Sequence, residues 1–261
     1  RIEPWIERHT PDGAHVTVTD VTSGTTLLTV QGPRSRDLLA RLTSADLSND
    51  AFPYLSAREI DLDYARVLAL RVTYVGELGW ELHVPAELAL TAYDALHVAG
   101  SDLGLGDVGL GAMGSLRLEK AYRDYGLDID NTDTPLDAGL GFTVAWDKPA
   151  GFVGRDALMA ARSITPPTRR LVQVLLGDPE PRLFGGEPVR RDGRWLGYVR
   201  AAGYGHTLGA AVGLAMLEDA AGLPRDAVEG ARFEIEVAGS IVPARVSLRP
   251  MYDPDRIRIL A

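Results

Sequence analysis

The sequence predicts an α+β fold in which a ferredoxin-like or mixed sheet with helices is followed by a helical connector and a small C-terminal β-barrel. Three observations support this prediction. Strand-like and helix-like runs alternate over the first hundred residues, another helical run follows, and short strand-like runs dominate after Pro166-Pro167. We therefore expect an α+β domain over residues 1–105, a helical connector over 106–165 and a barrel over 166–261.

The first part opens with a predicted hairpin and a short helix. Residues 15–20 and 25–30 are rich in Val and Thr, and Ser23-Gly24 lies between them, a spacing typical of two antiparallel strands. Pro33 then begins a leucine-rich helix, because a proline in the first turn of a helix loses no helical hydrogen bond.

A second hairpin and a longer helix complete this part. Residues 67–74 are strand-like, a glycine-containing turn covers 75–79, and apolar and polar side chains alternate over 80–84. A helix is predicted from Pro85 to Gly100, since its leucines and alanines share one face and glycine commonly ends a helix. This order favours helices on one face of a mixed or antiparallel sheet.

The connector is predicted to contain a helix over residues 115–125. Its apolar side chains recur at helical spacing, Glu119 precedes Arg123 by one helical turn, and Gly126 is placed to cap the C-terminus.

The last part is predicted to be a small barrel or sandwich, because closure removes exposed strand edges. Asp192-Gly193 and Ala238-Gly239-Ser240 are typical tight turns between strands. The predicted strands cover residues 170–176, 194–200, 211–217, 232–237 and 241–248.

Composition limits the functions open to this chain. A net charge of −9 and a pI near 5.1 argue against a nucleic-acid partner, because phosphate binding needs clustered Lys and Arg. No run approaches the roughly 18 to 20 apolar residues of a membrane span and no signal peptide opens the chain, so we expect no membrane partner and a cytoplasmic location. Without cysteine, any chemistry uses oxygen and nitrogen groups or a cofactor. Because the first residue is Arg1 rather than Met, we expect that an N-terminal part is missing.

Two glycine-containing motifs and the histidines are expected to be structural. Gly104-Leu-Gly-Asp-Val-Gly109 matches a dinucleotide fingerprint, but a predicted helix rather than a strand precedes it, which favours a flexible connector. Gly205-His-Thr-Leu-Gly209 has the outline of a nucleophile elbow but lies between two strands, which favours a β-turn. The five histidines lack metal-ligand spacing, so we expect no metal site.

The turn at residues 73–81 is the candidate binding site. It places Glu77 between Gly76 and Gly79 at the tip of a predicted hairpin, where glycines let a flat ligand approach the backbone. A carboxylate held there can accept two parallel hydrogen bonds from an amidine-like edge, such as that of a pterin or guanine. Tyr74 or Trp80 could supply a stacking surface. The alternative is an ordinary solvated glutamate.

These residues resemble the glycine-cleavage T-protein, or aminomethyltransferase, family. The family's signature turn is Tyr-Thr-Gly-Glu-x-Gly followed by an aromatic or apolar residue and Glu, and this chain has Tyr74-Val-Gly-Glu-Leu-Gly-Trp-Glu81. Ser115-Leu-Arg-Leu-Glu119 is similar to the family's Leu-Arg-Leu-Glu helix. The segments Thr134-Pro-Leu-Asp-Ala-Gly-Leu-Gly141 and Phe152-Val-Gly-Arg-Asp-Ala-Leu158 extend the resemblance, which runs over nearly the whole chain.

Within the family, residues 43–48, 76–81 and 118–122 look closest to the C-terminal half of dimethylglycine and sarcosine dehydrogenases or oxidases. Those proteins carry an N-terminal flavin domain that oxidises an N-methyl amine, and a C-terminal domain where tetrahydrofolate captures the one-carbon unit. The resemblance implies the second role for this chain, with tetrahydrofolate as cofactor and a small methylated amine as substrate. FAD is implied only if an upstream flavin domain exists in the native protein.

The resemblance also implies a three-lobed cloverleaf with folate in its central channel, in which residues 1–105 form a partial folate-binding domain. Carried over by position, Glu77 would hold the pterin edge, and Tyr74, Gly76, Gly79 and Trp80 would form the pocket around it. The implied chemistry presents an iminium or aminomethyl carbon to N5 of tetrahydrofolate, and positioning supplies much of the rate.

Two departures from the family pattern limit this transfer of roles. Ala112-Met113-Gly114 stands where aminomethyltransferases usually have Ala-Arg-Asp, so the family's folate-contacting arginine is absent there. The upstream Asp-Asp segment that holds the family's catalytic aspartate is not in this chain. We therefore assign no catalytic residue, leave Arg117 and Glu119 as structural, and expect weak or no folate binding by the fragment alone.

Two other functions stay open. One is a non-catalytic folate-binding or regulatory module, like the family members linked to iron–sulfur assembly, but those carry a Lys-Gly-Cys motif and this chain has no cysteine. The other is an O- or S-demethylase on the same fold, which the sarcosine-type blocks disfavour.

Overall fold

A computed structural model describes residues 2–261, which divide into two compact units. Unit 1 comprises residues 2–72 and 79–106, and unit 2 comprises residues 73–78 and 107–261. Most of the candidate turn therefore folds with unit 2, whereas Gly79 and Trp80 belong to unit 1. The boundaries predicted at residues 105 and 165 stay predictions.

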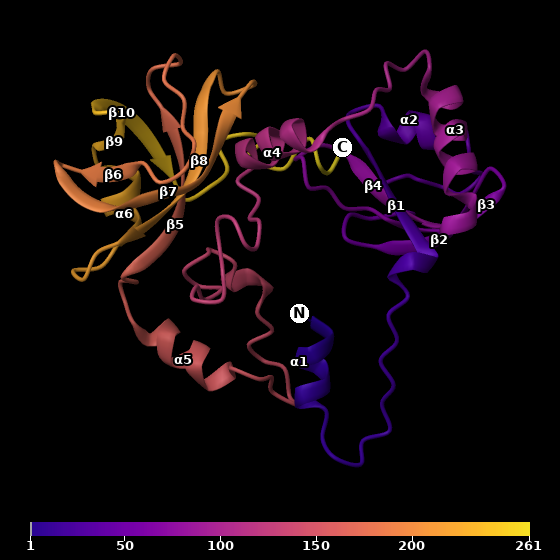
Figure 1. The fold of residues 1–261 in the computed structure, drawn as a ribbon, viewed down its shortest axis with the longest axis horizontal. Helices are drawn as coiled ribbons and strands as arrows, with labels where there is room; N and C mark the ends of the chain where they lie inside the picture. The colour runs from indigo at the N-terminus through magenta and orange to yellow at the C-terminus, as the bar shows by residue number, and fades with distance from the viewer. Residues whose placement is uncertain (1) are drawn as a thin grey trace. The chain divides into compact units, whose positions relative to one another are not determined.

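Unit 1 is built on a four-stranded antiparallel sheet (Figure 1). The strand order is β1-β4-β3-β2. The strands are β1 (Thr25–Gln31), β2 (Ala57–Leu62), β3 (Ala65–Leu70) and β4 (Gly79–Pro85). Along β4, apolar side chains are buried and the side chains between them are only partly buried, as the alternation in the sequence predicts.

Two helices contribute to the core of unit 1. Helices α2 (Ser35–Leu39) and α3 (Ala89–Gly100) contact β4 and each other. Both were predicted, and α3 is preceded by the short 3-10 helix η2 (Ala86–Leu88). Upstream of the sheet lie α1 (Ile2–His9), which buries no side chain, and the 3-10 helix η1 (Thr22–Gly24).

The predicted first hairpin is wrong. Residues 15–20 form no strand, and β1 pairs instead with β4, from Thr25 opposite Pro85 to Gln31 opposite Gly79. The run offers only Val16 and Val18 as apolar anchors, and both stay exposed, so it gains nothing from joining the sheet. The second predicted hairpin is confirmed, because β3 and β4 are antiparallel neighbours.

A hairpin that the sequence reasoning missed joins β2 to β3. Its turn places Asp63 at a φ of 52°, a left-handed conformation that aspartate tolerates better than most residues. The sequence pattern that indicates this hairpin is Asp63-Tyr64 between two alternating runs. It lacks the glycine that marks most such turns.

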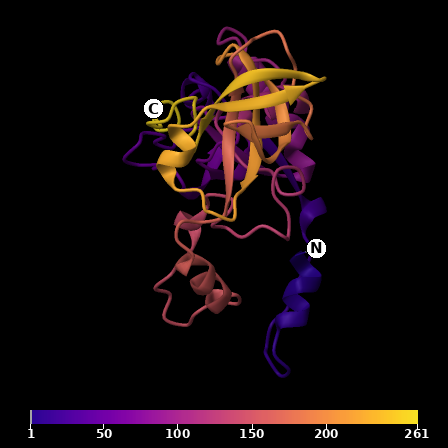
Figure 2. The same ribbon diagram turned by 90° about the vertical axis from the view of Figure 1, so that its left-hand side faces the viewer.

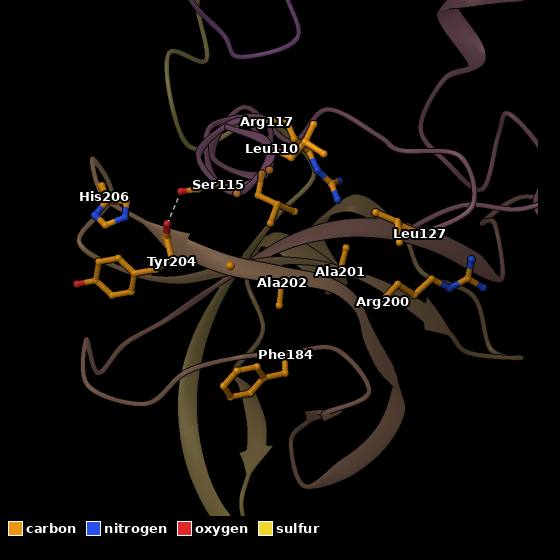
Figure 3. Close-up of a pocket in the computed structure, with 14 residues that line it drawn as sticks. Leu110, Ser115, Arg117, Leu127, Phe184, Arg200, Ala201, Ala202, Tyr204 and His206 are labelled. Carbon is orange, nitrogen blue, oxygen red and sulfur yellow. Dashed lines mark hydrogen bonds between the residues drawn. The ribbon is translucent and has the colours of Figure 1, made fainter. Parts of the chain in front are cut away.

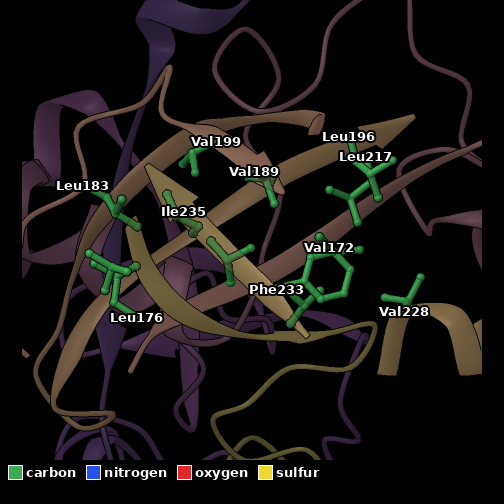
Figure 4. Close-up of a cluster of buried hydrophobic side chains, with 14 of the residues drawn as sticks. Val172, Leu176, Leu183, Val189, Leu196, Val199, Leu217, Val228, Phe233 and Ile235 are labelled. Atoms are coloured by element: carbon green, nitrogen blue, oxygen red, sulfur yellow. The ribbon is translucent and has the colours of Figure 1, made fainter. Parts of the chain in front are cut away.

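Unit 2 contains a closed antiparallel barrel, which confirms the predicted C-terminal barrel (Figure 2). Its strand order is β10-β5-β8-β7-β6-β9. Its core is a cluster of buried aliphatic side chains around Phe233 (Figure 4). All five predicted strands are present; β6 was missed because it is short and half of it is arginine. The strands are β5 (Arg169–Leu176), β6 (Pro188–Arg191), β7 (Arg194–Gly205), β8 (Ala210–Glu218), β9 (Phe233–Val237) and β10 (Ser240–Ser247).

The helix predicted over residues 115–125 lies earlier in the chain, as α4 (Leu110–Glu119). Ala121, at a φ of 55°, leaves the helical conformation, so Gly126 does not cap it. The expected pair of Glu119 and Arg123 does not form, because both side chains bind backbone groups elsewhere in unit 2. Spacing along the chain could not reveal those tertiary partners.

The remaining helices of unit 2 are short. They are η3 (Gly141–Thr143) and α5 (Arg155–Ser163) in the segment before the barrel, and α6 (Arg225–Glu229) between β8 and β9. Within residues 2–261, no helix is both long enough and apolar enough to cross a membrane.

Candidate functional site at the Glu77 turn

The candidate turn is fixed within unit 2 by its own side chains. Val75 and Leu78 are buried. The ring of Tyr74 stacks against that of Tyr122 at a centroid distance of 6.1 Å, and its hydroxyl donates to the carbonyl of Arg123 at 3.1 Å. The turn is therefore anchored to the segment that follows α4.

Gly76 is required by the packing of this turn. Its φ of 78° is left-handed, and a Cβ added there would lie only 3.0 Å from Cβ and Cγ of Lys120. Lys120 cannot easily move, because it is buried and its Nζ donates to Asp253 Oδ2 at 2.8 Å. A conformational and a steric reason therefore both favour glycine at this position.

We expect Gly76→Ala to lower the free energy of unfolding by about 1 to 3 kcal/mol, the cost of a strained left-handed residue. Urea unfolding measures it. The matched control is Gly114→Ala in α4, where a Cβ meets nothing within 4 Å and alanine favours the helix by up to about 1 kcal/mol. A Gly76→Ala protein as stable as the Gly114→Ala protein would contradict this account of the turn.

Each oxygen of the Glu77 carboxylate has a neighbouring side chain. The hydroxyl of Tyr252 donates to Oε1, and Nη1 of Arg258 lies 3.7 Å from Oε2. The Glu77 side chain is 17% exposed, so part of it remains reachable from solvent. Glu77 is thus an oriented, partly buried acceptor rather than a fully solvated side chain.

Tyr252 is suited to be a permanent donor to this carboxylate. Burial and then the hydrogen bond to Glu77 raise the pKa of Tyr252 well above its ordinary value. The phenol therefore stays protonated through the neutral range.

A buried amide holds the C-terminal segment in place. Gln173 Nε2 donates to the carbonyls of Leu118 and Glu119 at 2.7 and 2.9 Å, and its Oε1 accepts the backbone N–H of Met251 at 2.7 Å. The backbone N–H of Tyr252 donates to the carbonyl of Glu119 at 3.3 Å. The end of α4, the barrel strand β5 and the segment that carries Tyr252 are thereby connected.

Arg117 and Glu119 of the Leu-Arg-Leu-Glu helix motif make contacts within unit 2 that stabilise the fold, which agrees with the structural role expected for them. Arg117 pairs with Asp128 at 2.7 Å, and both side chains are buried. Oε1 of buried Glu119 accepts the backbone N–H groups of Thr207 and Leu208, each at 2.8 Å. The motif at residues 205–209 is therefore the β7–β8 turn, docked onto α4, and not a nucleophile elbow.

Gly79 and Trp80 lie in unit 1, where the packing of the sheet explains them. A Cβ at residue 79 would lie 2.6 Å from the carbonyl oxygen of Val30 and would collide with the side chain of Gln31. Trp80 is completely buried and meets the ring of Phe52 edge to face at 6.2 Å. A ligand-binding role for these two residues stays a prediction.

A cavity of about 510 Å³ in unit 2 is separate from the residues that hold Glu77 (Figure 3). It lies between one face of α4 and strand β7, whose small residues Ala201, Ala202 and Gly203 form one wall. Phe184 lines another side. Neither Glu77 nor Tyr252 lines it. Among residues 2–261, no three or more His, Asp or Glu side chains are grouped as metal ligands.

Sequence reasoning missed the partners of Glu77. These partners are Tyr252 and Arg258, which lie near the end of the sequence, where no motif marks them.

Comparison with known proteins places this geometry in a wider context. The family model described as the GCVT N-terminal domain matches residues 1–148, and the glycine cleavage T-protein C-terminal barrel domain matches residues 169–253. Over 247 residues the chain is 43% identical to 4-methylaminobutanoate oxidase (formaldehyde-forming) of Paenarthrobacter nicotinovorans, covering 95% of this chain and 29% of that protein. It is 38% identical to mitochondrial sarcosine dehydrogenase of Mus musculus, covering 89% of this chain and 25% of the relative.

A solved structure shows the same fold. The aminomethyltransferase T of the glycine cleavage system from Bartonella henselae superimposes with a TM-score of 0.73 at 27% identity, covering 88% of this chain and 60% of that one. The chain spans between a quarter and a third of the length of the two curated relatives above.

Proposed function

Since this chain belongs to the glycine-cleavage T-protein family, we propose that it supplies the tetrahydrofolate site of an enzyme that transfers one-carbon units, with Glu77 holding the pterin edge. The family is that of transferase-type enzymes, and the chain's relatives include oxidases and dehydrogenases of N-methylated amines. The observation that carries the proposal is an oriented, partly exposed carboxylate at the family's signature turn.

The donor set at the turn fits a pterin. An amidine edge offers an N–H and an NH2 side by side, and a carboxylate accepts both in parallel. Glu77 presents such an acceptor, and its orientation is fixed by Tyr252 on one oxygen. Tetrahydrofolate, when bound, would supply the nitrogen that accepts the one-carbon unit.

The residues of this chain would bind and orient rather than perform covalent chemistry. Glu77 would set the in-plane position of the ring, and Tyr74 and Gly76 would shape the turn behind it. For Gly79 and Trp80, a role in binding rests only on their place in the family's signature turn. Correct placement of two reactants is a large source of rate enhancement. We assign no catalytic acid or base.

The substrate and the second cofactor are part of the proposal. A small methylated amine is the proposed source of the one-carbon unit, because the relatives are named for such amines. FAD would enter only through a flavin domain beside this one in the native protein. A cytoplasmic location stays a prediction, since one of these relatives is named as mitochondrial.

The test is anaerobic calorimetric titration with tetrahydrofolate, on this chain and on any longer native polypeptide that contains it. We expect binding by the longer polypeptide, and weak or no binding by this chain alone. In the longer polypeptide, Glu77→Gln should weaken binding by about 1.5 to 3 kcal/mol, the value of a hydrogen bond to a charged group. The matched control is Glu236→Gln, a carboxylate of β9 paired with Arg190. If neither this chain nor the longer polypeptide binds tetrahydrofolate, the proposal is overturned.

A further inference from the structure

The two oxygens of Glu77 have unlike partners. Oε1 accepts a hydrogen bond from the half-buried phenol of Tyr252, whereas Oε2 faces an arginine 3.7 Å away whose side chain is 53% exposed. The first contact is a directed hydrogen bond. The second is beyond hydrogen-bond length and belongs to the exposed class of ion pairs, which contribute little. Of these two partners, Tyr252 is therefore the one that fixes the plane of the carboxylate.

We propose that Tyr252 is a positioning residue for ligand recognition at Glu77. Each carboxylate oxygen can accept more than one hydrogen bond, so the phenol occupies one acceptor position of Oε1 and leaves the second, with Oε2, for the paired N–H groups of the ligand. This inference rests on the proposed tetrahydrofolate site. The new element is that affinity for the ligand depends on the Tyr252 hydroxyl, which contacts Glu77 and need not contact the ligand.

The surroundings of Tyr252 favour this role. Its backbone is tied to the end of α4 by its own N–H and through Gln173, so the phenol cannot follow the carboxylate if the latter rotates. Asp253, the residue after Tyr252, forms a buried ion pair with Lys120, which holds this part of the backbone in place. The position of the donor is thus set by unit 2 before any ligand binds, which lowers the entropic cost of ordering the site.

The test is a double-mutant cycle on the dissociation constant of tetrahydrofolate, made in the longest native polypeptide that contains this chain. It uses the wild type, Tyr252→Phe, Glu77→Ala and the double variant. Tyr252→Phe keeps the ring and removes only the hydroxyl. We expect it to weaken binding about 10-fold in the wild-type background, the size of one charge-assisted hydrogen bond. In the Glu77→Ala background, where no carboxylate remains to be positioned, it should change affinity less than about 2-fold.

Each other outcome has a distinct meaning. An equal loss of affinity in both backgrounds would show that Tyr252 acts only through the fold. No loss of affinity in the wild-type background would show that Glu77 needs no positioning. Either result overturns this inference and leaves the proposed function intact. If the longest native polypeptide that contains this chain does not bind tetrahydrofolate, both are overturned. Tyr198→Phe, at an exposed tyrosine of β7, controls for loss of a hydroxyl, and thermal unfolding of each variant controls for loss of structure.

Discussion

Asp128→Ala is expected to lower the free energy of unfolding by about 3 to 5 kcal/mol, because it leaves a buried arginine without its counter-ion. Arg117 is buried, and its Nη1 donates to Asp128 Oδ1 at 2.7 Å and to the carbonyl of Tyr122 at 3.1 Å. The other oxygen of Asp128 accepts the N–H of Asp124 at 2.8 Å. The substitution therefore removes one charge and leaves two donors short of an acceptor. Urea unfolding of unit 2 measures the loss.

An exposed ion pair in unit 1 provides the control. Arg66 lies 3.0 Å from Glu59, but the two side chains are 66% and 64% exposed. Glu59→Ala should therefore cost no more than about 1 kcal/mol. If Asp128→Ala costs no more than Glu59→Ala, the pair does not stabilise the segment that holds the candidate turn.

Glu119→Ala is expected to have the second-largest effect, a loss of about 2 to 4 kcal/mol. Oε1 of Glu119 accepts two backbone N–H groups of the β7–β8 turn, and both lose their partner in the variant. Urea unfolding measures the loss of stability. Hydrogen exchange should show faster exchange of the amides of Thr207 and Leu208 in particular.

The conservative variant Glu119→Gln separates the hydrogen bonds from the charge. A glutamine oxygen can still accept both N–H groups, so its loss should be clearly smaller than that of Glu119→Ala. Equal losses, with unchanged exchange at Thr207 and Leu208, would mean that these hydrogen bonds do not hold the turn on α4.

The sequence predicted the features that depend on local pattern. The barrel strands, α2, α3 and the β3–β4 hairpin all carry strong alternation or helical periodicity, and all are present. The failures occurred where tertiary contacts decide. Residues 15–20 have strand-forming side chains but no buried face, and α4 ends early because Glu119 and Arg123 bind distant backbone groups rather than each other.

The same division holds for the candidate site. Glycine spacing and resemblance identified Glu77, because the turn is continuous in sequence. Tyr252 and Arg258 were invisible, since they reach Glu77 only once β5, α4 and the C-terminal segment have come together. The sequence could not show that Trp80 is a completely buried core residue of unit 1, since alternation along a strand predicts a buried face but not its depth.

The measurement that tests the central claim most directly compares the effect of Glu77→Gln on two ligands, tetrahydrofolate and an analogue that lacks the 2-amino group. If the carboxylate receives the amidine edge, the substitution should weaken tetrahydrofolate binding by about 1.5 to 3 kcal/mol. The same substitution should cost the analogue clearly less, because one of the two hydrogen bonds is already absent. An equal penalty for both ligands would contradict the assignment of Glu77 as the residue that holds the pterin edge.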